Sequence, residues 1–184
     1  MDTNTEIDHK KWMKLALAQA QDALLAGEFP VGCVLVASGK VVGQGRRLYS
    51  STLSNELDHA EILAIRDWIS QGRQGEDIWA YVTLEPCLMC FGALIINGIH
   101  RICFAYEDVM GGATGLSFNR SNSKGPPSEL IMGNIRDLYS SASIELVPWV
   151  MRQESLALFK KFFSDSKAEY LADTFLARYT LDTK

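Results

Sequence analysis

The segment from 78 to 105 constrains the fold of this chain more than any other. Residues 78–84 form a β-rich run, residues 86–97 an apolar helical run, and residues 100–105 a second β-rich run. A strand, a helix and a strand that follow one another so closely form a βαβ unit, in which the two strands are parallel. Polar groups that follow the first strand would then lie at the carboxyl end of the sheet, where α/β folds bind their ligands.

The turn after the first of these strands carries a metal-binding pattern. It reads Pro86-Cys87-Leu88-Met89-Cys90, and His59-Ala60-Glu61 precedes it along the chain. The two cysteines are three residues apart, so they lie on one face of a helix, of which Pro86 would be the first residue. Backbone N–H groups at the start of that helix favour negative charge and therefore thiolates.

His59, Cys87 and Cys90 together offer one imidazole and two thiolates to a metal ion. Three protein ligands and an open fourth position are typical of catalytic Zn²⁺. We therefore expect one Zn²⁺ per chain. Glu61 is expected beside the metal as the acid and base that takes a proton from water, passes it to the substrate and protonates the departing ammonia.

A closed structural zinc site is the alternative, because such sites use four protein ligands. None of the other candidates has ligand-like spacing to the first three: Cys33, Cys103, His9 and His100. Cys33 and Cys103 fall inside apolar, strand-like runs, where buried free thiols are expected.

The remaining elements complete an α/β pattern. The predicted helices span 8–26, 59–70, 86–97, 128–139, 151–164 and 168–179, and the predicted strands span 31–37, 41–46, 78–84, 100–105 and 143–147. Asp8 and Asp58 are the expected N-caps of the first two helices. Strands 31–37 and 41–46 form a hairpin, and a polar loop from 47 to 57 leads into the metal motif.

Three glycines fall in the predicted hairpin, at positions 32, 43 and 45. Glycine weakens a strand unless something must come close to the backbone. Two explanations remain open from the sequence: a ligand lies beside Gly32, or a helix packs closely against the strands.

Composition sets the limits on class and location. A chain of 184 residues with a net charge of −4 is expected to form one domain. No apolar run reaches the ~20 residues that would cross a bilayer, and the N-terminus has no signal-peptide character. We expect a soluble, cytoplasmic protein without membrane contact. The negative charge argues mildly against a large nucleic-acid interface.

The motifs also carry a family resemblance. The residues of 28–32 (Glu-Phe-Pro-Val-Gly), 59–61 and 81–90 resemble the cytidine deaminase superfamily, and within it the tRNA-specific adenosine deaminases most closely. The resemblance implies a three-layer α/β/α cytidine-deaminase-like fold with a central mixed sheet of about five strands. It also implies a single deaminase domain over 1–184, with a core at about 8–118 and a variable insert and C-terminal helices over 119–184.

The implied reaction is the hydrolytic conversion of an amino group on a nucleobase to a carbonyl, with release of ammonia. The resemblance implies substrate contacts at Val31, Ala60, Glu85 and Pro86, and a homodimeric assembly. The substrate would be the anticodon loop of a tRNA or a small molecule.

The sequence also departs from the resemblance. Family members usually place an asparagine after the second strand, where this chain has Gly45-Arg46-Arg47, and the next asparagine is Asn55. Asp58 stands where the tRNA branch has alanine, the 116–142 segment is an insert, and residues 164–184 are not basic. Arg46 and Asn55 are therefore candidate substrate contacts. Arg46 and Arg47 could bind a phosphate or carboxylate, or they could be a solvated strand end.

Three functions stay open on this basis. The first is tRNA adenosine deamination. The second is deamination of a free base, a nucleoside or a related small heterocycle of the guanine, cytosine or adenine type. The third is a non-catalytic partner subunit on a deaminase scaffold, against which the presence of Glu61 argues.

Overall fold

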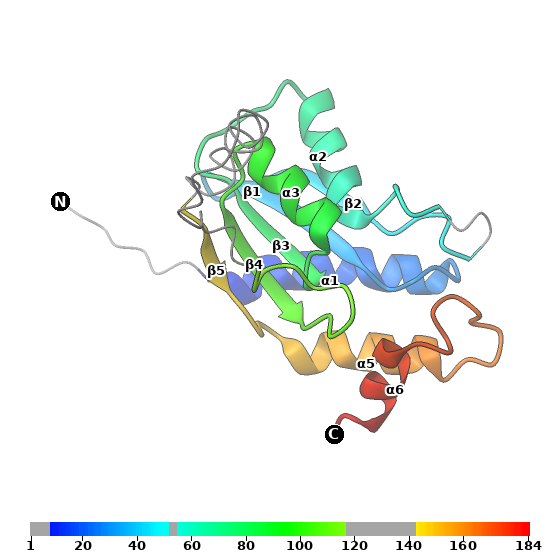
Figure 1. The fold of residues 1–184 in the computed structure, drawn as a ribbon. Coiled ribbons are helices and arrows are strands. Elements are labelled where there is room, and N and C mark those ends of the chain that lie inside the picture. The colour runs from blue at the N-terminus through cyan, green and yellow to red at the C-terminus, as the bar shows by residue number, and fades with distance from the viewer. Residues whose placement is uncertain (1–7, 52–54, 117–142) are drawn as a thin grey trace, which may run out of the picture.

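A five-stranded sheet forms the centre of the molecule in the computed structural model, which describes residues 8–51, 55–116 and 143–184 (Figure 1). The strands are β1 (Gly32–Ala37), β2 (Lys40–Arg46), β3 (Trp79–Leu84), β4 (Arg101–Tyr106) and β5 (Glu145–Val147). Their spatial order is β2-β1-β3-β4-β5. β1 is antiparallel to β2 and to β3, whereas β3, β4 and β5 are parallel. The predicted hairpin, parallel pair and mixed sheet are confirmed.

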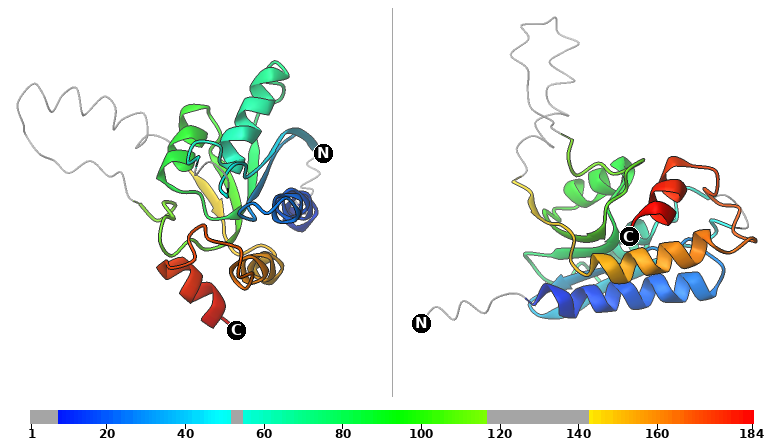
Figure 2. Two further views of the ribbon diagram at one scale, coloured as in Figure 1. Left: turned by 90° about the vertical axis from the view of Figure 1, so that its right-hand side faces the viewer. Right: turned by 90° about the horizontal axis from the view of Figure 1, so that it is seen from below.

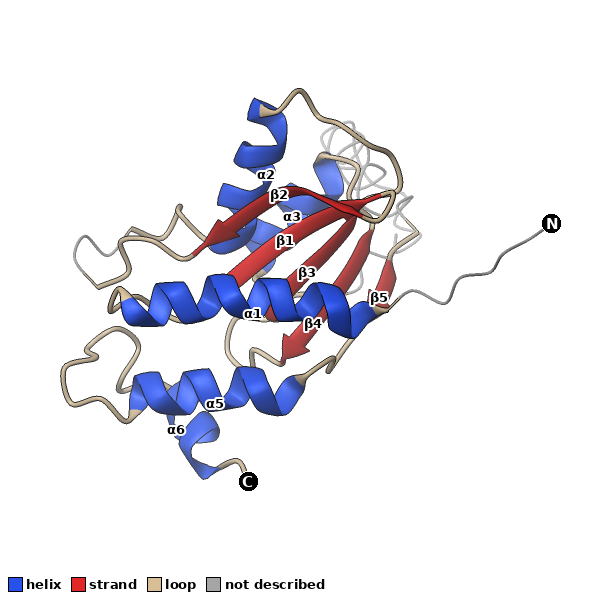
Figure 3. Cartoon of the chain, turned by 180° about the vertical axis from the view of Figure 1, so that it is seen from behind, coloured by secondary structure: helices blue, strands red, loops and turns tan. Residues whose placement is uncertain are grey.

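Helices cover both faces of this sheet. The helices are α1 (His9–Leu25), α2 (Ala60–Ser70), α3 (Leu88–Ile96), α5 (Arg152–Phe163) and α6 (Phe175–Asp182). α2 and α3 lie on one face, and α1 and α5 lie side by side on the other, with α6 packed on α5 (Figures 2 and 3). The three-layer α/β/α arrangement expected from the resemblance is therefore present. No helix of the described residues is both long and apolar enough to cross a membrane.

Alternation along the strands explains why both faces need a cover. β1 is buried at every position, with Cys33 and Leu35 in the core that α2 and α3 share, and Val34 and Val36 in the core below α1. β3 is also buried at every position. Strands that are buried on both faces have continuous apolar sequences, and these strands could therefore be predicted from the sequence. Cys33 and Cys103 are free, fully buried thiols, as predicted.

Close helix packing accounts for the strand glycines. A Cβ at Gly32 would lie 2.2 Å from the backbone oxygen of Ala16 in α1. One at Gly45 would lie 2.3 Å from the backbone oxygen of Ala60 in α2. The second of the two explanations left open by the sequence is therefore correct, and Gly45 sets how closely the start of α2 approaches β2.

Several predicted boundaries were wrong. His59, not Asp58, is the N-cap residue of α2, because the Asp58 carboxylate instead accepts hydrogen bonds from Asn55 and Arg66. Pro86 precedes the N-cap residue Cys87 of α3 and is not the first helical residue. The last helix begins at Phe175, where the Thr174 hydroxyl caps it, and not at 168. The helix predicted at 128–139 lies outside the described residues. Asp8 caps α1 as predicted.

Candidate metal centre and substrate cavity

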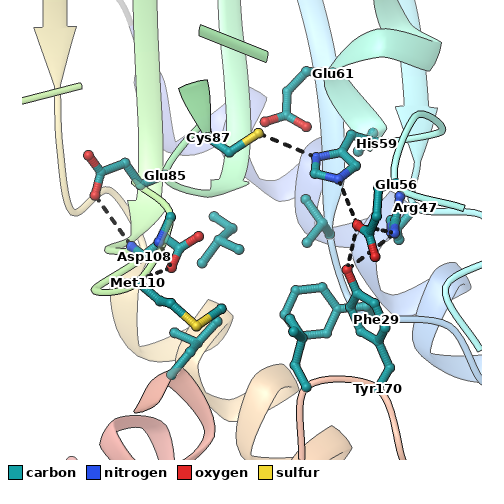
Figure 4. Close-up of a pocket in the computed structure, with 16 residues that line it drawn as sticks. Phe29, Arg47, Glu56, His59, Glu61, Glu85, Cys87, Asp108, Met110 and Tyr170 are labelled. Atoms are coloured by element: carbon teal, nitrogen blue, oxygen red, sulfur yellow. Dashed lines mark hydrogen bonds and ion pairs between the residues drawn. The ribbon is translucent and has the colours of Figure 1, made fainter. Parts of the chain in front are cut away.

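Two helix N-termini bring the three candidate metal ligands together at the carboxyl end of β3. His59 immediately precedes α2, Cys87 immediately precedes α3, and Cys90 lies in the first turn of α3. The Nδ1 atom of His59 is 3.6 Å from Sγ of Cys87 and 3.4 Å from Sγ of Cys90. Figure 4 shows Cys87 directed at the imidazole of His59. The sequence thus predicted this cluster, and the βαβ topology places it.

The spacing of these atoms fits a tetrahedral zinc ion. Zn–S bonds of ~2.3 Å and Zn–N bonds of ~2.0–2.1 Å in tetrahedral geometry separate nitrogen from sulfur by roughly 3.6 Å. The two observed N···S distances are 3.6 and 3.4 Å, and the three ligand atoms lie within 4.8 Å of one another. The chain therefore has a His/Cys/Cys site of the type that holds zinc.

The site has only three protein ligands among the described residues. The other candidates have different partners: His9 contacts the Tyr81 hydroxyl, and His100 contacts the backbone oxygen of Ile95. Cys87 is half-buried and lines a cavity, whereas Cys90 is fully buried. The metal position is therefore open on the cavity side, as a catalytic site requires.

The two thiols are electrostatically unequal. A hydrogen bond from Cys90, and a further one from His59, lower the pKa of Cys87 to about 4, against the opposing effect of burial. The same bond to Cys87, together with burial, raises the pKa of Cys90. Cys87 is therefore a thiolate at neutral pH, and Cys90 must release a proton when a cation binds.

Glu61 lies in the first turn of α2, beside the cluster and on the wall of the same cavity. Its side chain is buried, and burial raises the pKa of its carboxyl to about 7. A carboxyl that titrates near neutral pH can both accept and release a proton during turnover. The position agrees with the role predicted for Glu61 from the sequence.

The cavity has a volume of about 240 Å³. This is slightly below the ~300–1,000 Å³ that is usual for pockets that take drug-sized ligands, so it suits a single heterocycle. Its apolar wall comes mainly from Phe29, Val31, Leu84, Met110, Leu171 and Leu176. Its polar groups outside the metal cluster are Arg47, Glu56, Glu61, Glu85, Asp108 and Tyr170.

Glu85 connects the end of β3 to a loop that closes one side of the cavity. Its carboxylate accepts hydrogen bonds from the backbone N–H of Asp108 and from the backbone N–H and hydroxyl of Thr114. A Cβ at Gly112 would lie 2.4 Å from this carboxylate, so the loop fits closely around it. The Glu85 side chain therefore holds the loop from 108 to 114 in place.

The predicted substrate contacts divide into two groups. Val31, Ala60 and Glu85 line the cavity. Arg46, Asn55 and Pro86 are not among its lining residues. Arg46 is partly exposed and lies 3.8 Å from Asp22.

The other two residues of the second group have local partners. The Asn55 side chain donates to Asp58 and accepts from the Leu57 backbone, and the Pro86 carbonyl accepts from the Ala113 backbone. Neighbouring groups therefore engage these three residues away from the cavity lining, and their role as substrate contacts stays a prediction.

Arg47 differs completely from Arg46. Its side chain is buried, and its Nη2 donates to Glu56 and to the Tyr170 hydroxyl. The interpretation as a solvated strand end therefore holds for Arg46 but not for Arg47. Glu56 and Tyr170 were missed from the sequence, since they carry no motif and lie 114 residues apart.

The chain is similar to known deaminases. Residues 6–106 match the family described as the cytidine and deoxycytidylate deaminase zinc-binding region. tRNA-specific adenosine deaminase 2 of Xenopus laevis is 35% identical over 79% of this chain and 87% of its own length.

Two solved structures are similar as well. One, from a study of A-to-I editing by tRNA:A34 deaminases at the wobble position of transfer RNA, has 27% identity and a TM-score of 0.61 over 80% of this chain and 98% of that one. Guanine deaminase from Nitrosomonas europaea shares the fold, with 20% identity and a TM-score of 0.61 over 83% of each chain.

Proposed function

Since the chain belongs to the cytidine and deoxycytidylate deaminase family, on the branch of the tRNA-specific adenosine deaminases, we propose that its substrate is adenosine in a tRNA anticodon loop. The chain is a hydrolytic deaminase of nucleobases, as its family implies. The observation that carries the choice of tRNA is the 35% identity to tRNA-specific adenosine deaminase 2 of Xenopus laevis. The buried Glu61 carboxyl, beside the His59, Cys87 and Cys90 cluster in a cavity of base-like size, supports the deamination itself.

The chemistry divides between a metal ion and one carboxyl. His59, Cys87 and Cys90 would hold Zn²⁺, which lowers the pKa of a water molecule and so provides a nucleophile at neutral pH. Glu61 would take one proton from that water and transfer it to the ring nitrogen. It would then take the remaining proton from the hydroxyl group added to the ring carbon and deliver it to the departing amino group, which leaves as ammonia. A pKa of about 7 suits both directions of transfer. Burial on the cavity wall keeps this carboxyl within reach of the reacting edge of a bound base.

The cavity-lining residues supply the proposed substrate contacts. Val31 would form part of the apolar wall against the ring, and Ala60 and Glu85 would offer backbone groups to its edge. The Glu85 carboxylate is occupied by Thr114 and Asp108, so its side chain would act by holding the loop rather than by binding the base.

The same proposal covers the assembly. It assigns one Zn²⁺ to each chain, a single domain over 1–184, a homodimer and a cytoplasmic location. Exposed apolar side chains on α3, Leu88 and Ile96, support a second copy as the partner.

A second candidate is a deaminase of a free base, nucleoside or related small heterocycle. Tyr170, Leu171 and Leu176, all from the C-terminal segment, line the cavity and so narrow the space open to a large substrate. Among the described residues that line the cavity, Arg47 is the only lysine or arginine, and Glu56 pairs with it. Both features favour a small, uncharged ligand.

Release of ammonia by the zinc-loaded chain distinguishes the candidates. The panel holds an anticodon stem-loop RNA with adenosine at the wobble position, free adenosine, cytidine and guanosine, and the bases adenine, cytosine and guanine. Glu61→Gln serves as the inactive control, and Glu76→Gln, at an exposed position outside the cavity, serves as the matched active control. Turnover of the RNA alone supports the proposed substrate, and turnover of a small molecule alone supports the second candidate.

A further inference from the structure

Glu56 lies between the metal ligand His59 and two residues, Arg47 and Tyr170, that no motif connects to the site (Figure 4). We infer that Glu56 is a positioning residue for His59, and that Arg47 and Tyr170 hold Glu56 in place. The C-terminal segment would thereby support the metal centre. This inference rests on the proposed zinc site.

The orientation of the His59 ring determines what its second nitrogen can do. Nδ1 faces both thiol sulfurs, at 3.6 and 3.4 Å, so Nδ1 must be free of a proton to bind a cation. The ring proton of neutral His59 then lies on Nε2, which is 3.5 Å from the Oε2 atom of Glu56. The Nε2–H group therefore faces the Glu56 carboxylate at ion-pair distance.

Such a carboxylate matters for metal binding. A histidine ligand that donates its other N–H group to a carboxylate is fixed in one tautomer and one ring orientation, and it becomes a stronger ligand. The loss of such an acceptor typically costs about 10–100-fold in metal affinity or activity. Glu56 is suitably placed for this effect, whereas Glu61 lies on the other side of the cluster, as the close-up shows (Figure 4).

Glu56 needs support of its own. Its side chain is 60% exposed and lies on the loop before α2, so without partners it could turn away from His59. The Tyr170 hydroxyl donates to Glu56 Oε2 at 2.9 Å, and Nη2 of Arg47 donates to the same oxygen at 3.1 Å. Nη2 also donates to the Tyr170 oxygen at 3.2 Å, so each of the three side chains is hydrogen-bonded to the other two.

Arg47 is the buried member of this group of three side chains. Its residue is only 1% exposed, its backbone N–H donates to the Val31 carbonyl, and its guanidinium lies over the Tyr170 ring at 5.5 Å. Its Nε and Nη1 atoms are buried and have no hydrogen-bond partner in the described structure. Among the described residues, the side-chain hydrogen bonds of Arg47 therefore all come from Nη2, and Glu56 is the carboxylate that compensates its buried charge. This ion pair commits Arg47 to Glu56 rather than to a bound phosphate.

Zinc affinity tests the inference directly. We compare Glu56→Gln and Tyr170→Phe with the wild type by competition with a chromophoric zinc chelator. The controls are Glu76→Gln and Tyr49→Phe, which make the same chemical changes at exposed positions outside the cavity. The spectrum of the Co²⁺-substituted protein reports ligand geometry, and chemical denaturation shows that each variant is folded.

We expect Glu56→Gln to weaken zinc binding by about 10-fold or more and to alter the Co²⁺ spectrum. Tyr170→Phe keeps both charges, so it should weaken zinc binding by a smaller factor. The double variant should be no weaker than Glu56→Gln alone, since Tyr170 acts through Glu56. Both control variants should match the wild type.

Two results would overturn the inference, and they have different meanings. If Glu56→Gln is folded and binds zinc within twofold of the wild type, Glu56 is only a partner of Arg47, and the proposed function is untouched. If the wild type itself does not bind zinc, the proposed function fails, and this inference fails with it. If Glu56→Gln does not fold, Tyr170→Phe becomes the test of the inference. Unchanged zinc affinity and an unchanged Co²⁺ spectrum in Tyr170→Phe would then refute the link between the C-terminal segment and the metal centre.

Discussion

Gly45→Ala should damage both the stability and the chemistry of this protein, because Gly45 sets the distance between β2 and α2. The added Cβ would lie 2.3 Å from the Ala60 carbonyl oxygen and 2.6 Å from the Ala64 backbone nitrogen. Both atoms belong to the backbone of α2, so no side-chain rotation can relieve the clash. The shortest ordinary contact is 3.4 Å, so strand and helix must separate by about 1 Å.

The size of the effect follows from this separation. Overpacking of a well-packed interior lowers the free energy of unfolding by about 1–3 kcal/mol. Replacing glycine with alanine raises it by roughly 0.5–1 kcal/mol, because alanine restricts the unfolded chain. We expect a net loss of about 1–2 kcal/mol in the free energy of unfolding. His59 and Glu61 flank Ala60 at the contact point, and a 1 Å displacement of reacting groups can cost about 100-fold in turnover.

Urea denaturation, chelator competition for zinc and ammonia release measure these effects together. Gly115→Ala is the matched control, because no heavy atom of the described residues lies within 4 Å of its added Cβ and its backbone does not require glycine. If Gly45→Ala is as stable and as active as Gly115→Ala, then the close approach of α2 to β2 does not position the site, and the reasoning is refuted.

Three further predictions concern the proton shuttle, a buried carboxylate and the metal. Glu61→Gln should bind zinc normally but lose turnover by about 10²–10⁴-fold or more; ammonia release near the wild-type rate would contradict the mechanism. Glu28→Gln should destabilise the fold by about 2 kcal/mol at pH 7, because the buried Glu28 carboxylate accepts hydrogen bonds from the Ser50 backbone and hydroxyl and from the Ser51 backbone. Burial raises the pKa of Glu28, but these hydrogen bonds lower it by more, so the pKa in the folded protein lies below the ordinary 4.5. The stabilisation by the Glu28 carboxylate is therefore complete above pH 4.5 and is lost as the pH falls through the lower pKa of the folded state. The stability difference between wild type and Glu28→Gln should accordingly shrink in acid. A difference independent of pH would refute the stabilising role of the carboxylate. Removal of zinc by a chelator should lower the Tm of the wild type, since a ligand at 100 times its Kd adds about 2.7 kcal/mol to the folded state; Cys90→Ser should show a much smaller shift, and equal shifts would place the metal elsewhere.

The metal cluster and the Glu61 carboxyl beside it were predictable because they depend on short-range spacing. Cys87 and Cys90 are three residues apart at a strand-to-helix junction, and Glu61 is two residues from His59. The βαβ unit brings that junction to the carboxyl end of the sheet, and the structure places the ligand atoms within 4.8 Å. The buried strands were equally clear, since both of their faces are covered.

Other features depended on which residues are brought together across long stretches of chain. Arg46 and Arg47 are neighbours in sequence, but successive residues at the end of a strand point in opposite directions. One therefore lies near Asp22 at the surface and the other is buried against Glu56. The sequence contains both arginines but does not encode locally which one turns inward.

The sequence alone determined the chemistry that we propose for this protein: the His59, Cys87 and Cys90 ligand set, the Glu61 carboxyl as its acid and base, and the mixed α/β fold that presents them. Only the tertiary structure decided the surroundings of that chemistry. It placed Tyr170 in the cavity wall, 123 residues from its partner Arg47, and it directed Glu56 to the free nitrogen of His59. The physical reason is that local periodicity fixes which face of an element is apolar, whereas contacts between distant segments depend on how whole elements pack.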